Sequence, residues 1–326
     1  MNLLRRRLLV VLGPTSIGKT DLALQLAHKF QGELISVDSR QVYRGLDIGT
    51  GKLPGKEVAV KKGEGFWEMN GIKTWLYDVV DPKKQYSVFD YVKDAGRVIE
   101  EIRKRGKLPI IVGGTGLYLK ALLEGLSNLS IPSDKKLRGQ LQKFTKQELQ
   151  EKLMKIALKR WEAMNFSDRE NPRRLVRAIE LVISPRTSPY GYLRGISASY
   201  NILKIGLTAP REALYKKIND KILELIQERI VDEVSKLIKK GLSKKRLMEL
   251  GLEYAVVLEY LEKKISLDQM IEQMQNKVRQ YARRQITWFK KEKNVFWFNV
   301  TGEGFAKKIE KLISKWYNIS KYAAES

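Results

Sequence analysis

The feature that most constrains the fold is a glycine-rich octapeptide near the start of the chain. It consists of Gly13, Pro14, Thr15, Ser16, Ile17, Gly18, Lys19 and Thr20, and it fits the pattern G-x-x-x-x-G-K-[ST]. Because an apolar run precedes it and an amphipathic segment follows, the pattern predicts a loop between a buried strand and a helix. Such a loop turns backbone N–H groups toward a di- or triphosphate, with Lys19 against the terminal phosphates and the Thr20 hydroxyl on Mg²⁺. The motif leaves open which phosphate compound binds.

Apolar runs alternate with helical segments through the first third of the chain. We expect strands at Leu8–Leu12, Leu34–Val37, Thr74–Val80 and Leu108–Val112. We expect helices at Asp21–Phe30 and from Ser87, as N-cap, to Arg105. Strands that are apolar throughout and are separated by helices are typical of a parallel sheet covered on both faces. The predicted fold class is therefore α/β, a parallel sheet flanked by helices.

From about Glu124 the pattern changes to helical and strongly basic stretches, broken by prolines such as Pro132. A strand signal as strong as those of the first third returns only at Ile202–Leu207. Helices are then expected to about residue 293, followed by a strand at 295–300 and a closing helix at 304–317. We therefore predict that residues 1–124 together with 201–326 form a catalytic core and that residues 125–200 form a mainly helical insertion.

Composition restricts both the partner and the chemistry. Lysine and arginine total 62 against 37 acidic residues, and the net charge of +25 makes nucleic acid the leading partner. The chain has no cysteine and one histidine, His28, in a helical run, so acid–base chemistry falls mainly to carboxylates, lysine or the substrate. No apolar stretch is long enough to span a membrane. We expect a cytoplasmic monomer without membrane contact.

A second polar segment begins at Asp38, directly after the predicted strand Leu34–Val37. Asp38 could hold Mg²⁺, as the second acidic motif of a nucleotide hydrolase does. It could also cap a helix, or it could recognise a base edge together with the amide, guanidinium and aromatic side chains of residues 39–43. The segment by itself leaves these three interpretations open.

Five blocks of sequence follow one another along most of the chain, at residues 13–20, 35–52, 108–118, 171–180 and 281–289. Together they resemble the tRNA dimethylallyltransferases, also called tRNA isopentenyltransferases. The phosphate loop alone is generic and occurs in many families. In combination with it, Asp38-Ser39-Arg40-Gln41 and the Gly-Gly-Thr-Gly-Leu-Tyr block at 113–118 are highly specific for this family. The resemblance implies a P-loop NTPase-like core.

The resemblance also implies a reaction. A dimethylallyl group would pass from dimethylallyl diphosphate to N6 of the adenosine at tRNA position 37, next to the anticodon, giving N6-isopentenyladenosine. The octapeptide Gly13–Thr20 would then cradle the diphosphate of the donor, with Mg²⁺ on Thr20. Asp38 would orient the exocyclic amine and take its proton.

The family pattern further implies contacts for individual residues of this chain. Lys217 would bind the diphosphate, although the family often has arginine there and lysine lacks the bidentate fork. Gly251-Leu-Glu-Tyr254 matches its family block only loosely, so it receives no role. The anticodon stem-loop of tRNA would be contacted by Asp38, Ser39, Arg40, Gln41, Thr115, Arg173, Arg174, Arg177, Arg283 and Arg284.

Two other functions are compatible with parts of the sequence. A P-loop small-molecule kinase using ATP would explain the phosphate loop, and the arginine-rich insertion could imitate its lid. An RNA-binding protein without catalytic activity would explain the charge of +25 but not the complete phosphate loop. Transfer of label from dimethylallyl diphosphate into tRNA separates all three.

Overall fold

The computed structural model describes residues 6–54, 58–126, 128, 131, 133–183 and 195–322. The chain divides into two compact units, residues 1–123 with 196–326 and residues 124–195. The predicted insertion at 125–200 therefore ends later than the second unit does. Its last residues instead form the 3-10 helix η2 (Ile196–Ser199) of the first unit, where the Ser197 hydroxyl donates a hydrogen bond to the Leu123 carbonyl at 2.6 Å.

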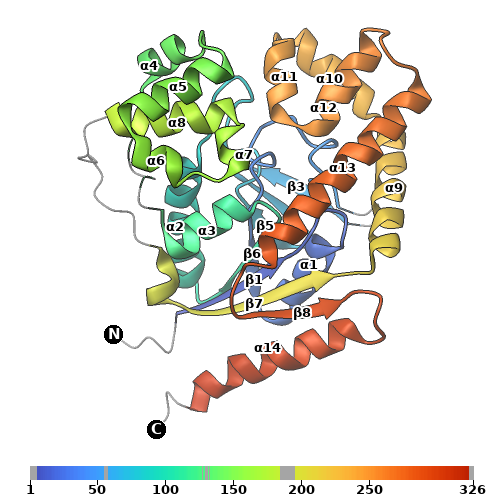
Figure 1. Ribbon diagram of the computed structural model, residues 1–326. Helices are drawn as coiled ribbons and strands as arrows, with labels where there is room; N and C mark the ends of the chain where they lie inside the picture. Colours follow the sequence, from blue (N-terminus) through green and yellow to red (C-terminus); the bar gives the residue numbers. More distant parts are fainter. Residues whose placement is uncertain are drawn as a thin grey trace. The chain divides into compact units, whose positions relative to one another are not determined.

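The first unit contains an eight-stranded sheet in the order β3-β4-β5-β2-β6-β1-β7-β8 (Figure 1). The six strands from β5 to β8 are parallel. Their bounds are β5 (Ile72–Trp75), β2 (Gly32–Ser36), β6 (Leu108–Gly113), β1 (Arg7–Leu12), β7 (Asn201–Thr208) and β8 (Val295–Asn299). The predicted α/β fold class is confirmed, and the apolar run Leu8–Leu12 is wholly buried because neighbouring strands and packed helices enclose it.

One edge of the sheet was not predicted. Strands β3 (Val60–Gly63) and β4 (Phe66–Met69) form an antiparallel extension of β5. The Asn70-Gly71 pair between β4 and β5 is a common hairpin turn, and both residues have positive φ, so the signal was present in the sequence. The strand predicted at Thr74–Val80 was wrong in its extent, since β5 ends at Trp75 and the next residue, Leu76, has a φ of 66°.

Helices cover the sheet as the alternating pattern predicted. α1 (Lys19–Lys29) packs on β1, β2 and β6, and α2 (Val88–Lys104) packs on β2 and β6. Ser87 is the N-cap of α2, as expected, and forms a reciprocal capping box with Asp90. His28 is an exposed residue in the last turn of α1. The remaining helices of the first unit are α3 (Gly116–Glu124), α9 (Arg211–Gln227), α10 (Ile230–Lys239), α11 (Lys244–Leu250), α12 (Leu252–Leu261), α13 (Leu267–Phe289) and α14 (Phe305–Tyr322).

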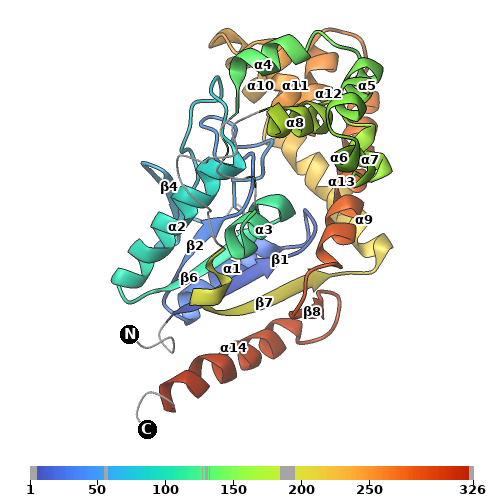
Figure 2. The same cartoon turned by 60° about the vertical axis from the view of Figure 1, so that its left-hand side comes forward.

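The closing helix α14 extends beyond its predicted end at residue 317 and lies along β7 and β8 (Figure 2). No helix in the described part of the chain is both long and apolar enough to cross a membrane.

The described elements of the second unit are helices around a small apolar core. They are α4 (Lys135–Leu141), α5 (Lys146–Ile156), α6 (Leu158–Glu162), α7 (Phe166–Arg169) and α8 (Pro172–Ile183). The Glu180 side chain is fully buried and accepts hydrogen bonds from Arg138, Arg177 and the Asp134 amide. The arginines and the backbone amide compensate the cost of burying that carboxylate.

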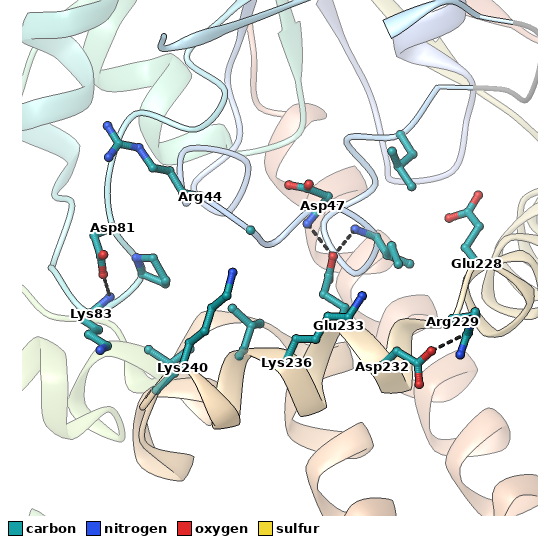
Figure 3. A pocket seen from close by; sticks show the side chains of 16 residues that line it. Arg44, Asp47, Asp81, Lys83, Glu228, Arg229, Asp232, Glu233, Lys236 and Lys240 are labelled. Atoms are coloured by element: carbon teal, nitrogen blue, oxygen red, sulfur yellow. Dashed lines mark hydrogen bonds and ion pairs between the residues drawn. The ribbon is translucent and has the colours of Figure 1, made fainter. Parts of the chain in front are cut away.

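A long loop after β2 is held by a buried carboxylate from α10. Glu233 Oε2 accepts hydrogen bonds at 2.8 Å from the backbone N–H groups of Asp47 and Ile48 (Figure 3). Its Oε1 accepts from the Gly49 amide at 3.1 Å and from the Tyr254 hydroxyl at 2.7 Å. Because the loop has no sheet partner for these amides, Glu233 replaces the missing backbone acceptors.

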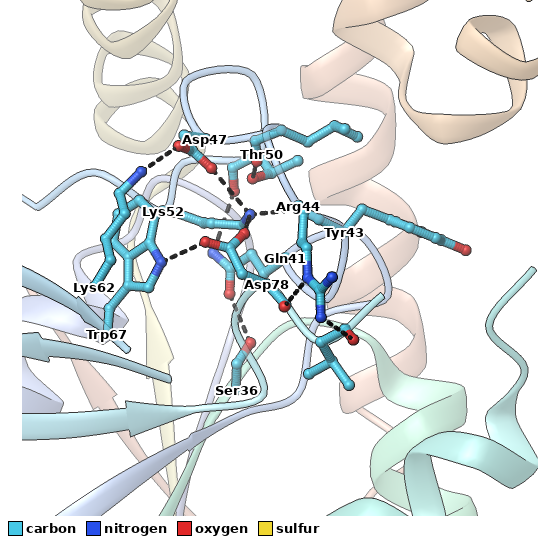
Figure 4. A network of polar contacts seen from close by, with 12 residues as sticks. Ser36, Gln41, Tyr43, Arg44, Asp47, Thr50, Lys52, Lys62, Trp67 and Asp78 are labelled. Carbon is cyan, nitrogen blue, oxygen red and sulfur yellow. Dashed lines mark hydrogen bonds and ion pairs between the residues drawn. The ribbon is translucent and has the colours of Figure 1, made fainter. Parts of the chain in front are cut away.

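A buried lysine holds the same loop from its other end. Lys52 Nζ, whose side chain is 0% exposed, donates to the Tyr43 carbonyl at 2.6 Å and to the Asp78 carboxylate at 2.5 Å (Figure 4). It also pairs with Asp47 at 3.1 Å, and Trp67 Nε1 donates to the second oxygen of Asp78 at 2.6 Å. The two carboxylates, which are only partly exposed, therefore compensate the charge of the buried Lys52 ammonium.

Replacing this buried ammonium is expected to destabilise the protein strongly. In Lys52→Met the Tyr43 carbonyl loses its donor and Asp78 loses its charged partner, so the free energy of unfolding should fall by about 3–5 kcal/mol in urea denaturation. Lys62→Met is the matched control, because Lys62 pairs with the same Asp47 but is 53% exposed. It should change stability by less than about 1 kcal/mol. Equal effects of the two variants would contradict the role given to burial.

Candidate active site

The octapeptide forms the predicted loop between β1 and α1. Gly18 is the residue before α1 and has a φ of 95°, a conformation that side chains with a Cβ rarely adopt. The amides of the first turn of α1 face the loop with no side-chain cap, which suits an anion. Ile17, in contrast, is buried in the core and anchors the loop.

Lys19 lies over the loop, and its Nζ donates to the Pro14 carbonyl at 2.6 Å. Burial lowers the pKa of Lys19 to about 8, and the nearby Asp38 carboxylate opposes this shift. A buried ammonium with a weakened hold on its proton is stabilised by a bound anion. The side chain is therefore positioned and electrostatically suited to accept a phosphate.

Beside the loop lies a cavity of about 610 Å³. It brings together residues far apart in the sequence: Thr15, Ser16, Gly18, Lys19, Thr20, Asp38, Gln41, Lys217, Glu253, Tyr281 and Gln285. The predicted diphosphate ligand Lys217 thus reaches the same cavity as the loop, from α9. A phosphate site and a carboxylate therefore share one cavity.

Asp38 follows β2, at the carboxyl end of the parallel strands. Its Oδ1 accepts hydrogen bonds from the amides of Arg40, at 2.8 Å, and Gln41, at 3.4 Å. These amides belong to a turn and not to a helix, so of the three interpretations the helix cap is wrong. Among the described residues, nothing donates a hydrogen bond to Oδ2, which leaves that oxygen available for substrate.

Thr115 supports the segment that carries Asp38. Its hydroxyl accepts a hydrogen bond from the Ser39 amide at 3.1 Å, and its own amide donates to the Val37 carbonyl at 3.0 Å. Gln41 is also engaged, since its amide nitrogen donates to the Thr50 carbonyl at 3.2 Å and its oxygen accepts from the Ser36 hydroxyl at 2.6 Å. In this structure Thr115 and Gln41 therefore position backbone.

The structure points to a residue of α13 that the sequence analysis did not consider. Gln285 accepts a hydrogen bond from the Thr15 amide at 2.8 Å and donates one to the Gly114 carbonyl at 3.0 Å. A Cβ at Gly114 would come within 2.2 Å of Gln285 Nε2, so glycine is required for this approach. Gln285 directly follows Arg283 and Arg284 in the same sequence block, but its neutral amide does not by itself indicate a binding role.

The two arginines themselves face outward. Arg283 and Arg284 are exposed and are not among the residues that line the cavity. Arg284 lies over the ring of Tyr281, at 5.8 Å from its centroid. Trp288 is 38% exposed and lies against Gly116, so it is not a core residue.

The predicted arginines of the second unit have different environments. Arg173 and Arg174 are exposed on α8, and Arg174 forms an ion pair with Asp168. The Arg177 guanidinium is bound within the second unit, because it donates hydrogen bonds to Glu180 and to the carbonyls of residues 128 and 131. Arg177 thus has a structural role in this state, whereas Arg173 and Arg174 present their side chains at the surface.

The lowered pKa of Lys19 predicts a pH-dependent affinity for phosphate compounds. Lys19 is charged below about pH 8 and loses its proton above it, so affinity for inorganic diphosphate should fall as pH rises. The quantity to compare is the ratio of wild-type affinity to that of Lys19→Ala, because the titration of diphosphate itself affects both proteins equally and cancels. Between pH 7 and pH 9 this ratio should drop by about tenfold. Calorimetric titration measures this ratio, with Lys29→Ala as control, because Lys29 lies on the same helix as Lys19 but does not line the cavity. A constant ratio would contradict this role of Lys19.

Comparisons with known proteins agree with this geometry. A family model described as IPP transferase matches residues 41–292, and one described as isopentenyl transferase matches residues 6–64. The tRNA dimethylallyltransferase of Halalkalibacterium halodurans is 35% identical over 313 residues, covering 94% of this chain and 95% of that protein. The tRNA dimethylallyltransferase of Acetivibrio thermocellus is 38% identical over 298 residues, covering 89% and 91%.

Solved structures give the same result. The crystal structure of the full-length tRNA isopentenylpyrophosphate transferase from Bacillus halodurans has a TM-score of 0.69 and 32% identity, covering 98% of this chain and 100% of that one. A eukaryotic dimethylallyltransferase acting on tRNA has a TM-score of 0.73 at 24% identity, covering 90% and 74%, which supports the fold alone. With these matches spanning nearly its whole length, the chain belongs to the IPP transferase family, that of the tRNA dimethylallyltransferases.

Proposed function

We propose that this enzyme transfers a dimethylallyl group from dimethylallyl diphosphate to N6 of the adenosine at tRNA position 37, next to the anticodon. The observation that carries the proposal is the single cavity that holds both the phosphate loop, with Lys19 and Thr20, and the carboxylate of Asp38. A prenyl transfer needs an anion site for the leaving diphosphate and a base for the incoming amine. The relatives are named for transfer of a dimethylallyl group to tRNA and not for the phosphorylation that a P-loop kinase would perform.

The phosphate loop would stabilise the leaving group. As the bond between the allylic carbon and oxygen breaks, negative charge builds on the diphosphate, and the amides at the start of α1 face that charge. Lys19, held by the Pro14 carbonyl, adds a positive charge that is already desolvated, so little reorganisation is needed. Lys217, exposed on α9 at the edge of the cavity, would contact the outer phosphate as a point charge.

Asp38 would take the proton of the amine. The exocyclic amine of adenine is a weak nucleophile, and bond formation to the allylic carbon makes its hydrogens acidic. Two backbone amides fix Oδ1 of Asp38, which leaves Oδ2 for one N–H of the substrate. That N–H proton would end on Asp38 as the new carbon–nitrogen bond forms.

Mg²⁺ is the proposed cofactor. Among the described residues no group of three or more histidine, aspartate or glutamate side chains could hold a metal alone. The Thr20 hydroxyl in the cavity nevertheless fits the way Mg²⁺ usually binds to phosphate loops, through one hydroxyl, phosphate oxygens and water. When bound, it would neutralise charge on the leaving diphosphate.

We propose the anticodon stem-loop of tRNA as the partner, with the second unit as its main binding surface. That unit exposes many cations to solvent: Lys135, Lys136, Lys143, Lys146, Lys155, Lys159, Arg173 and Arg174. Such side chains contact phosphates, while the target base must leave its stack to reach Asp38. A monomeric state and a cytoplasmic location stay predictions.

Removing the proposed base should stop chemistry and spare binding. Asp38→Asn keeps an oxygen for the amides of residues 40 and 41 but cannot accept the proton, so kcat should fall by about 10²–10⁴-fold. The assay is transfer of label from dimethylallyl diphosphate into an anticodon stem-loop, with binding of both substrates measured separately. Asp81→Asn, which does not line the cavity, is the control. A kcat within threefold of wild type would show that Asp38 is not the base.

Deleting the second unit should separate the two binding functions. Because Ser197 is hydrogen-bonded to Leu123, a short glycine linker can join residues 123 and 196. This variant should bind dimethylallyl diphosphate and lose tRNA binding. In the wild-type protein, binding to the stem-loop should weaken steeply as the salt concentration rises, because phosphate contacts release counterions. A fully paired duplex of equal length should not be modified, because its bases stay stacked. A folded deletion variant with wild-type affinity and salt dependence would contradict this assignment.

A further inference from the structure

Glu253 is a carboxylate in the wall of the active-site cavity to which neither the sequence blocks nor the reaction above gives a role. It lies in the first turn of α12, and it lines the cavity together with Lys19, Asp38 and Tyr281. The side chain is partly buried and forms no ion pair with any described residue. Its carboxyl group accepts a hydrogen bond from its own backbone N–H and keeps further hydrogen-bonding capacity for a substrate in the cavity.

The backbone that carries Glu253 is fixed on both sides. The next residue, Tyr254, is buried and donates its hydroxyl hydrogen to Glu233, the carboxylate that also holds the loop at residues 47–49. A Cβ at Gly49 or at Gly251 would come within 2.7 Å of the Tyr254 ring, so both backbones pack directly on that ring. Glu253 is therefore held on a rigid element, as a recognition residue must be.

The electrostatic surroundings favour the neutral form of this side chain. Burial raises the pKa of Glu253 to about 7, the Asp38 carboxylate raises it further, and the Arg40 guanidinium lowers it. A hydrogen bond from its own backbone N–H also lowers the pKa. The other titratable groups that line this cavity are Lys19, Asp21, Tyr77, Lys217, Asp220, Lys221, Glu224 and Tyr281. A neutral carboxyl group carries one donor and one acceptor side by side.

Adenine presents a matching pair along its edge, the N6 amine as donor and the neighbouring ring nitrogen as acceptor. Gln41, whose amide could pair with that edge, is already bonded to Ser36 and to the carbonyl of Thr50. We propose that Glu253, as the neutral acid, holds the target adenine by this edge. Its hydroxyl donates to the ring nitrogen and its carbonyl oxygen accepts one N6 hydrogen, which leaves the other N6 hydrogen to Asp38. The inference rests on the proposed function and specifies how its base is recognised.

The test compares Glu253→Gln with Glu253→Ala across pH. A glutamine amide also offers a donor and an acceptor, but it does not titrate. Glu259→Ala is the matched control, because Glu259 lies on the same helix and does not line the cavity. The measurements are kcat and KM for an unmodified anticodon stem-loop and KM for labelled dimethylallyl diphosphate, between pH 6.5 and 8.5.

We expect the wild-type KM for the stem-loop to rise by about tenfold or more over this range, because Glu253 ionises and loses its donor hydrogen. Glu253→Gln should keep transfer at pH 6.5 and show a KM that no longer follows this titration. Glu253→Ala should raise KM for the stem-loop by about tenfold or more at pH 6.5, the size of a paired base contact, with KM for the donor changed less than twofold.

Three results would overturn the inference. They are loss of transfer in Glu253→Gln at every pH, a KM in Glu253→Gln that titrates like wild type, and an unchanged KM in Glu253→Ala. If the wild-type protein itself transferred no label, the proposed function would fail first and this inference with it. Melting temperatures of the variants, compared with Glu259→Ala, distinguish a lost contact from a lost fold.

Discussion

Two buried charges, Glu233 and Lys52, hold the loop between β2 and β3, and the active-site cavity depends on them. A segment without helix or strand leaves amides and carbonyls unpaired, and burying them unpaired is costly. Glu233 accepts three loop amides, and Lys52 donates to a loop carbonyl and to two carboxylates. The loop can therefore form one wall of the cavity as a fixed surface. Neither charge takes part in the proposed chemistry.

Parallel strands bring the chemical groups together at one edge of the sheet. The phosphate loop follows β1, Asp38 follows β2, and the Gly113-Gly114 pair lies at the end of β6, and these three strands are neighbours. Such an edge is the usual ligand site of open α/β sheets. Gln285 then links two of these loops from α13, through the Thr15 amide and the Gly114 carbonyl. The anion site and the base thus share a cavity because of strand order and one amide side chain.

Sequence patterns predicted the parallel strands well and the hairpin edge poorly. Strands such as β1 and β6 are buried on both faces, so nearly all of their residues are apolar and the run is conspicuous in the sequence. β3 and β4 contain lysine, glycine and glutamate, and their pairing is decided by turns such as Asn70-Gly71. In the site, the charge of Arg283 and Arg284 led to their prediction as binding residues, and both are exposed. The neutral Gln285 was not predicted, although it is buried beside the phosphate loop. A pattern shows a residue type but not the direction of its side chain.

The sequence by itself determined the phosphate loop, the α/β class, the family and the position of Asp38 after its strand, because each depends on a contiguous motif or on short-range periodicity. Only the tertiary structure decided which distant side chains complete the cavity. Gln285, Lys217 and Glu253 come from three different helices, and no local rule fixes which way a helix turns its polar residues. Packing against the core and the compensation of buried charge choose that direction. Core packing and charge compensation both depend on contacts between residues that are distant in the sequence. They can therefore be read only from the folded structure.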